Sequence, residues 1–218
     1  MMLTSVLGMV MMASSRDLVS IFVALEFLSI PAYMLAAWRK RDSRSNEAGA
    51  KYFLLGVFAS AVMLYGMSLV YGATGSTLLV DIGASLDDSR MTSVRVLGIV
   101  FIVIGFAFKV SAVPFHTWAP DTYEGAPPTI TTLLAAGTKK AGFAATIRIV
   151  VLGMVVLNLD WTLALGVIAV MTMTIGNIAA IMQKNLARML AYSSIAHAGY
   201  ILIGLAVSPY SSLGLQGS

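Results

Sequence analysis

The sequence contains no cysteine and little charge. The absence of cysteine among its 218 residues excludes disulfides, thiolate metal sites and cysteine nucleophiles. The two histidines, His116 and His197, lie too far apart in the sequence to suggest a metal site. Charged residues make up 11% and hydrophobic residues 58% of the chain, against roughly 25% and 45–50% in soluble domains. This composition excludes an ordinary soluble fold, and we expect no redox chemistry in this chain itself.

Long apolar runs account for most of the chain. A hydrocarbon core about 30 Å thick needs roughly 20 apolar residues per crossing helix. The segment 1–13 is too short for a full span and lacks the basic start of a signal peptide, so we expect a truncated helix there. These runs predict an all-α, polytopic transmembrane bundle. The six full runs are 18–38, 51–72, 93–113, 128–157, 161–182 and 189–207.

The short loops differ in positive charge, which indicates orientation. The basic residues sit beside apolar runs, where topology explains the net charge of +4 better than a nucleic-acid partner does. An even number of crossings puts the two most basic loops on one face of the membrane. We predict that this face, with loop 39–51, is the cytoplasmic side of a bacterial plasma membrane, or the matrix or stromal side of an organelle membrane. That face carries Arg39, Lys40, Arg41, Arg44, Lys51, Lys184 and Arg188; the other carries Arg16, Arg90, Arg95, Arg148, Asp81, Asp87 and Asp88.

Glu26 lies inside the run 18–38, where a helix would bury its carboxyl group in the hydrocarbon. A carboxyl group there is either protonated or held ionised by a cation, which is the two-state behaviour of a proton carrier. A static ion pair between two helices is the alternative. Pro31, five residues on, is expected to kink the helix and free a backbone carbonyl.

Lys109 is followed closely by Ser111 and Pro114, so we predict a break in the helix beside its ammonium group. Broken helices at membrane depth mark ion sites, because the released backbone groups can solvate ions and water. The alternative is a lysine that reaches the headgroup region by snorkelling.

Lys139 and Lys140 fall near the middle of the run 128–157, where insertion costs about 2.5–3.5 kcal/mol per lysine. Adjacent helical residues project about 100° apart, so one lysine can face a polar interior while the other needs water, an acid or a neighbouring subunit. A buried lysine near a changing charge can alternate between proton donor and acceptor. The pair therefore suits a proton relay.

His197 lies inside the last apolar run and shares a helical face with Ser193 and Ser194. Such a face could serve a proton relay. A structural hydrogen bond to a neighbouring helix explains a membrane histidine equally well.

Four segments carry a family pattern: 25–33 (LEFLSIPAY), 108–127 (FKVSAVPFHTWAPDTYEGAP), 137–143 (GTKKAGF) and 188–200 (RMLAYSSIAHAGY). In content, order and spacing they resemble the N subunit (chain 2) family of respiratory complex I, the proton-pumping NADH-quinone oxidoreductase. The segment 108–127 is the most specific of the four, and the resemblance runs through nearly the whole chain.

The resemblance implies a fold of two antiporter-like inverted repeats, each with a broken helix. Residues 1–157 would form the first repeat and residues 158–218 the first two helices of the second. The family's relay positions match Glu26, Lys109, Lys139 and His197, whereas Lys140 stands where the family usually has an apolar residue. A later broken helix with the exit half-channel would follow beyond residue 218, so we expect the chain to be a fragment.

The resemblance also implies a function: proton translocation coupled to quinone reduction elsewhere in the complex. NADH, FMN, iron-sulfur clusters and quinone would belong to other subunits, with no cofactor or metal in this chain. Its partners would be neighbouring antiporter-like and small membrane subunits and the lipid bilayer. One alternative is a subunit of a Mrp-type cation/proton antiporter or membrane-bound hydrogenase, which usually carry a histidine-containing loop in place of residues 121–124. Another is a non-conducting scaffold in which ion pairs hold the helices together.

Overall fold

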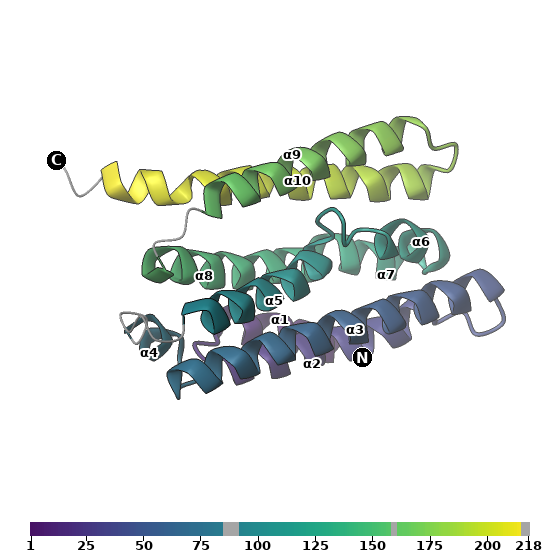
Figure 1. The fold of residues 1–218 in the computed structure, drawn as a ribbon. Helices are drawn as coiled ribbons and strands as arrows, with labels where there is room; N and C mark the ends of the chain where they lie inside the picture. The colour runs from purple at the N-terminus through teal and green to yellow at the C-terminus, as the bar shows by residue number, and fades with distance from the viewer. Residues whose placement is uncertain (85–91, 158–160, 215–218) are drawn as a thin grey trace.

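The computed structural model describes residues 1–84, 92–157 and 161–214, and its long helices lie side by side in a bundle (Figure 1). Within these ranges, five helices are long and apolar enough to cross a membrane. The predicted multi-pass helical bundle is therefore confirmed. The five candidate spans are Leu18–Ala36, Ser43–Thr74, Ser93–Val110, Leu163–Ile181 and Leu186–Val207.

The helices follow the apolar runs closely. The run 128–157 forms three consecutive helical segments, which are α7, η3 and α8. Asp87, Asp88 and Arg90, which we assigned to one loop, lie outside the described residues, as does the start of the expected second repeat at residue 158. The elements are α1 (Met2–Ser14), α2 (Leu18–Ala36), α3 (Ser43–Thr74), α4 (Leu79–Ala84), α5 (Thr92–Val110), α6 (Trp118–Gly125), α7 (Pro128–Thr132), the π-helix η3 (Leu133–Thr138), α8 (Lys139–Leu157), α9 (Trp161–Ile181) and α10 (Leu186–Gly214).

Aspartate caps set the beginnings of α2 and α3. The Asp17 carboxylate accepts hydrogen bonds from the backbone N–H groups of Val19 and Ser20, and Asp42 does the same for Arg44. These bonds satisfy N–H groups that the first turn of a helix leaves free. Because of its cap, α3 begins in the polar loop, eight residues before the apolar run at 51.

Pro31 lies in the interior of α2. The helix is continuous from Leu18 to Ala36 across this residue, and the kink that we expect at Pro31 stays a prediction. The neighbouring helix α1 packs closely against α2: Ser5 Oγ donates a 3.1 Å hydrogen bond to the carbonyl oxygen of Leu28. The close contact places the middle of α2 against buried residues of the bundle.

The middle of the bundle contains the two irregular segments. Figure 1 shows α5 and α8 between the pair α9–α10 on one side and the group α1–α3 on the other. The helices α9 and α10 pack mainly against each other, and α10 also contacts α6 and α8. The end of α5 and the π-helix η3 therefore lie where helices from both sides can reach them.

Candidate functional site

The break after α5 is built so that its freed backbone groups have partners within the protein. The helix ends at Val110, and Ser111 takes a left-handed conformation (φ 61°) that non-glycine residues rarely adopt. Trp118 Nε1 donates a 2.9 Å hydrogen bond to the carbonyl oxygen of Phe108, and the N–H of Val113 donates a 3.1 Å bond to Thr172 Oγ1 on α9. The predicted break beside Lys109 is therefore present, and side chains of α6 and α9 stabilise it.

Lys109 lies on the last turn before the break and is 3% exposed. Its Nζ donates a 2.7 Å hydrogen bond to Ser29 Oγ on α2 and a 3.5 Å bond to the hydroxyl oxygen of Tyr52 on α3. Gly142 on α8 makes room for the lysine stem, since a Cβ there would lie 3.2 Å from Lys109 Cγ. The amine is therefore held by hydroxyl groups and aromatic surface, and it does not reach toward the headgroups.

Glu26 lies one helical turn before Ser29 on α2 and is partly buried. Its Oε1 accepts a 2.6 Å hydrogen bond from Ser60 Oγ on α3. In the described part of the chain, Glu26 and Lys109 form no ion pair within 4.0 Å. The acid and the amine therefore each bind a serine, Ser60 and Ser29, and the residue that binds Lys109 lies one turn beyond Glu26 on the same helix.

Lys139 and Lys140 have opposite environments. Lys139 is 4% exposed, donates a 2.7 Å hydrogen bond from Nζ to Ser194 Oγ on α10, and lies 5.5 Å from the ring centroid of Tyr123. Lys140 is exposed. Of the two, only Lys139 faces the interior that Lys109 also faces.

The π-helix before Lys139 explains why its orientation was hard to predict. Its i→i+5 hydrogen bonds widen one turn and rotate every following residue relative to a regular helix. Thr138 Oγ1 bonds back to the carbonyl oxygen of Leu134 at 2.8 Å within this turn. The first two residues after the widened turn are Lys139, directed inward, and Lys140, directed outward.

His197 lies on an exposed face of α10, with its ring 5.6 Å from that of Tyr200. Ser194, on the preceding turn, is the residue of this helix that contacts Lys139. The structure thus binds Lys109 to Ser29 on the helix that carries Glu26, and it joins Lys139 to α10. It does not bring His197 into these contacts, so its role in a relay stays a prediction.

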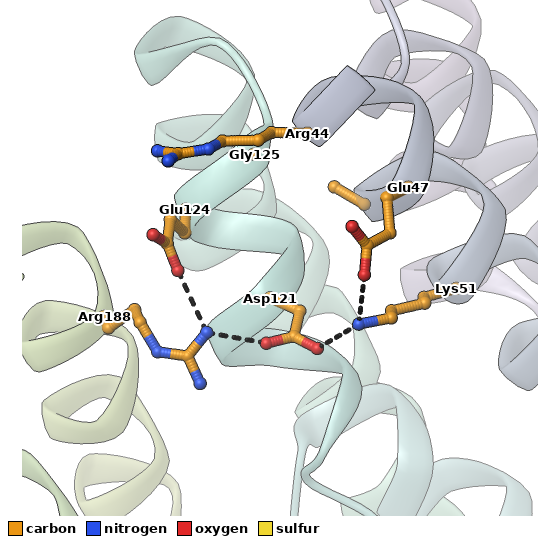
Figure 2. Close-up of a pocket in the computed structure, with 8 residues that line it drawn as sticks. Arg44, Glu47, Lys51, Asp121, Glu124, Gly125 and Arg188 are labelled. Carbon is orange, nitrogen blue, oxygen red and sulfur yellow. Dashed lines mark hydrogen bonds and ion pairs between the residues drawn. The ribbon is translucent and has the colours of Figure 1, made fainter. Parts of the chain in front are cut away.

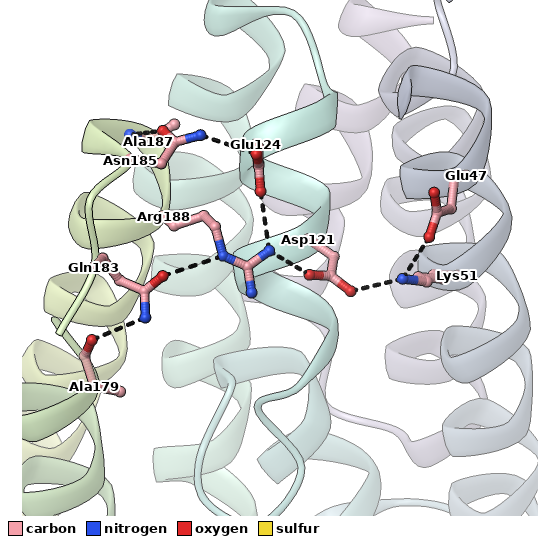
Figure 3. A network of polar contacts seen from close by, with 9 residues as sticks. All are labelled: Glu47, Lys51, Asp121, Glu124, Ala179, Gln183, Asn185, Ala187 and Arg188. Carbon is pink, nitrogen blue, oxygen red and sulfur yellow. Dashed lines mark hydrogen bonds and ion pairs between the residues drawn. The ribbon is translucent and has the colours of Figure 1, made fainter. Parts of the chain in front are cut away.

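A network of charged side chains, which sequence reasoning did not identify, closes the basic end of the bundle. Asp121 on α6 binds Lys51 of α3 at 2.8 Å and Arg188 of α10 at 2.7 Å (Figure 2). Arg188 also binds Glu124 at 2.9 Å, and Lys51 binds Glu47 at 2.7 Å. These contacts link the three helices in one network (Figure 3). Because Lys51 and Arg188 share one partner, the two basic loops lie at the same end of the bundle, as the charge pattern predicted.

This network surrounds a cavity of about 320 Å³ between α3, α6 and α10. Burial alone would raise the pKa of Asp121, but hydrogen bonds with Lys51 and Arg188 hold it below its ordinary value. Asp121 is therefore ionised at neutral pH and stabilises both cations. The charged residues that line the cavity are Arg44, Glu47, Lys51, Asp121, Glu124 and Arg188.

The fold and these buried groups define a class: a multi-pass membrane protein with a broken helix and two lysines held in its interior. A family model described as "NADH:quinone oxidoreductase/Mrp antiporter, TM" matches residues 15–217. The chain belongs to this family.

Curated relatives match nearly the whole chain. It is 51% identical over 200 residues to "NADH-quinone oxidoreductase subunit N" of Heliobacterium modesticaldum, covering 91% of the chain and 42% of the relative. It is 49% identical over 199 residues to the protein of the same name from Desulforamulus reducens, with coverage of 91% and 42%. The chain thus spans about two fifths of the length of these relatives.

Solved structures share the fold. A chain of respiratory complex I from Thermus thermophilus matches with a TM-score of 0.79 and 40% identity, covering 93% of this chain and 43% of that one. A chain of the Mrp complex from Dietzia matches with a TM-score of 0.82 and 25% identity, covering 92% and 37%. Both are chains of larger complexes, so the chain has the fold of a membrane subunit.

Proposed function

We propose that the chain is part of a proton-translocating membrane subunit of an NADH-quinone oxidoreductase, in which Glu26, Lys109, Lys139 and His197 form the proton relay. The observation that carries this proposal is the bonding of the two buried lysines: each donates to a serine hydroxyl, and neither forms an ion pair within the described residues. A lysine fixed by a carboxylate would hold its proton permanently, whereas one held by hydroxyls can release it.

Glu26 acts as the switch in this account. When quinone reduction in another subunit draws Glu26 toward Lys109, the carboxylate favours the protonated ammonium. When Glu26 withdraws toward Ser60, which already binds it at 2.6 Å, the amine releases one proton toward Lys139 through intervening waters. Lys139 accepts that proton on its neutral amine and later passes it on, and His197 belongs with the waters to the path between Lys109 and Lys139. A unit charge that crosses 100 mV costs about 2.3 kcal/mol, a size that such rearrangements can supply.

The remaining assignments follow from the same proposal. Residues 1–157 form the first repeat, and residues 158–218 begin the second. The loop 39–51 faces the cytoplasm of a bacterial plasma membrane, and protons enter at the cavity between α3, α6 and α10. Neighbouring antiporter-like and small membrane subunits are the partners, and NADH, FMN, iron-sulfur clusters and quinone belong to other subunits.

Two observations favour this function over the alternatives. Identity to the complex I chain is 40%, against 25% to the Mrp chain. A scaffold held by intramembrane ion pairs is disfavoured because the ion pairs within 4.0 Å between described residues all belong to the charged network at the basic end, and none involves Lys109 or Lys139.

The test uses the assembled complex that contains this chain, reconstituted in vesicles with a pH-sensitive dye inside. We expect NADH and quinone to drive proton movement in sodium-free buffer. Exchange of sodium for protons without NADH would instead support the antiporter alternative. Loss of the assembled complex in Glu26 and Lys109 variants, with transport unchanged in whatever assembles, would support the scaffold.

A further inference from the structure

Lys140 is an exposed lysine near the middle of the apolar run 128–157. It follows Pro128 by twelve residues, which is roughly 18 Å along a helix and more than half of a hydrocarbon core about 30 Å thick. Pro128 and Arg39 line the same cavity, so Pro128 lies at the level of the basic loops. A four-carbon lysine stem is too short to return the ammonium to that level.

The surface around Lys140 continues a groove between η3 and α10. This groove has a volume of about 450 Å³, and Ala136 of η3 and Leu190 of α10 both line it. Lys140 lies four residues beyond Ala136, and His197 lies seven residues beyond Leu190, spacings that keep each pair on one face of its helix. All four residues are exposed. We call these four residues the Lys140 surface.

Lys140 and His197 lie at similar depth. His197 follows Leu186, the first residue of α10, by eleven residues, or roughly 16 Å. The hydrogen bond between Lys139 and Ser194 joins the two helices at this level. Lys140 follows Lys139 by one residue and His197 follows Ser194 by three, and the side chains of Lys140 and His197 are both exposed.

Lipid tails cannot satisfy these groups. In the described part of the chain, the Lys140 ammonium has no hydrogen bond or ion pair, and hydrocarbon offers no acceptor. Lipid phosphates are confined to the headgroup region, roughly 15 Å or more from the midplane of a 30 Å core. A carboxylate on another transmembrane helix is the acceptor that charge and depth both fit.

We propose that the Lys140 surface binds a transmembrane helix from outside this chain, and that this helix presents an aspartate or glutamate to Lys140, with His197 beside it. The groove from Ala136 and Leu190 receives apolar side chains of the same helix. This interface does not depend on which ion the complex transports.

Charge reversal in the assembled complex tests the proposal. We expect Lys140→Glu to lower the amount of assembled complex about tenfold or more, because two carboxylates would then face each other in a low dielectric. Lys140→Arg keeps the charge and is expected to assemble normally. The matched control is Lys184→Glu, the same change at an exposed lysine between α9 and α10. Normal assembly of Lys140→Glu, as in the control, would overturn the proposal.

A photo-crosslinking residue at position 140 identifies the occupant. Adducts with a peptide from an apolar span that contains an aspartate or glutamate would support the proposal. Replacement of that acid by lysine should then restore assembly of Lys140→Glu. Adducts with lipid alone, from a complex that is assembled, would show that the surface faces the bilayer and would overturn the proposal.

Discussion

Lys109 Nζ donates a 2.7 Å hydrogen bond to Ser29 Oγ, so a serine hydroxyl stands where a carboxylate would complete a static ion pair. Glu26 lies one turn away on the same helix and is held by Ser60 instead. A buried amine with neutral partners keeps its proton less firmly than one in a salt bridge. Lys109 and Glu26 therefore have separate serine partners, and the proposed mechanism moves Glu26 between Ser60 and Lys109.

Replacement of Ser29 tests this arrangement. Ser29→Ala removes the acceptor nearest to Lys109 and leaves a buried ammonium hydrogen without a partner, at a cost of about 1–3 kcal/mol. We expect proton movement per electron to fall while the complex still assembles. Ser29→Thr keeps the hydroxyl and serves as the control. Equal losses in both variants would point to packing rather than to the hydrogen bond.

The contact between Lys139 and Ser194 leads to a second prediction. Lys139→Met preserves the length of the side chain and removes its amine, so we expect it to abolish the proton transfer that passes through this chain. Ser194→Ala leaves the amine in place and should have a smaller effect. Proton uptake by vesicles that contain each variant measures both. A larger effect of Ser194→Ala would contradict the assignment of Lys139 as the relay group.

The indole of Trp118 stabilises the break after α5. Trp118→Phe keeps an aromatic ring to stack on Tyr52, whose ring centroid lies 4.5 Å from that of Trp118, but removes the hydrogen bond to Phe108. A freed carbonyl in a membrane interior has no water to replace that bond, so we expect a loss of about 1–2 kcal/mol. Thermal unfolding in detergent measures the change.

Tyr52→Phe provides a comparison for Trp118→Phe. It keeps the stacked ring and removes only a hydroxyl group whose bond to Lys109 is long, at 3.5 Å. We expect a smaller loss of thermal stability than for Trp118→Phe. The opposite order would show that the hydroxyl group of Tyr52 contributes more to stability than the bond from Trp118 to Phe108.

The network at the basic end predicts a dependence of stability on pH. The pKa of Asp121 is lower in the folded protein than its ordinary value of 3.8. The ionised Asp121 therefore contributes its full stabilisation at pH values above its ordinary pKa. That contribution is lost as the pH falls through the lower pKa of the folded protein. We expect Asp121→Asn to lower stability by about 1 kcal/mol near neutral pH, since these pairs are partly exposed.

Melting temperatures of both proteins, measured from pH 7 down to pH 3, test this prediction. The difference between wild type and Asp121→Asn should stay constant at neutral pH and shrink below about pH 4. A constant difference throughout would mean that the asparagine disturbs packing instead of removing a charge.

Much of the fold followed from the sequence. Length and hydropathy gave the spans, and Ser111 with Pro114 marked the break beside Lys109, because these are local properties of the chain. The helix α2 continues through Pro31 as one helix. Tertiary packing against α1 and α3 decides whether a proline interrupts a helix, and no local sequence pattern contains that packing.

The site was harder to predict. The free-energy cost of burying a lysine did not distinguish Lys139 from Lys140. The π-helix before them rotates the residues that follow, so their directions could not be read from regular helical spacing. Ser29 could have been found, since it lies three residues after Glu26 on one helical face. The contacts of Tyr123 and Asp121 could not be found, because Tyr123 contacts Lys139 of α8 and Asp121 binds residues of α10 and α3.

The most direct test of the central claim is the number of protons moved per electron in the assembled complex with Lys109→Met. The control is Lys184→Met, which removes an exposed lysine far from the broken helix. If Lys109 carries the proton, the ratio falls in Lys109→Met and stays at the wild-type value in the control, with both complexes assembled. A wild-type ratio in Lys109→Met would contradict the account.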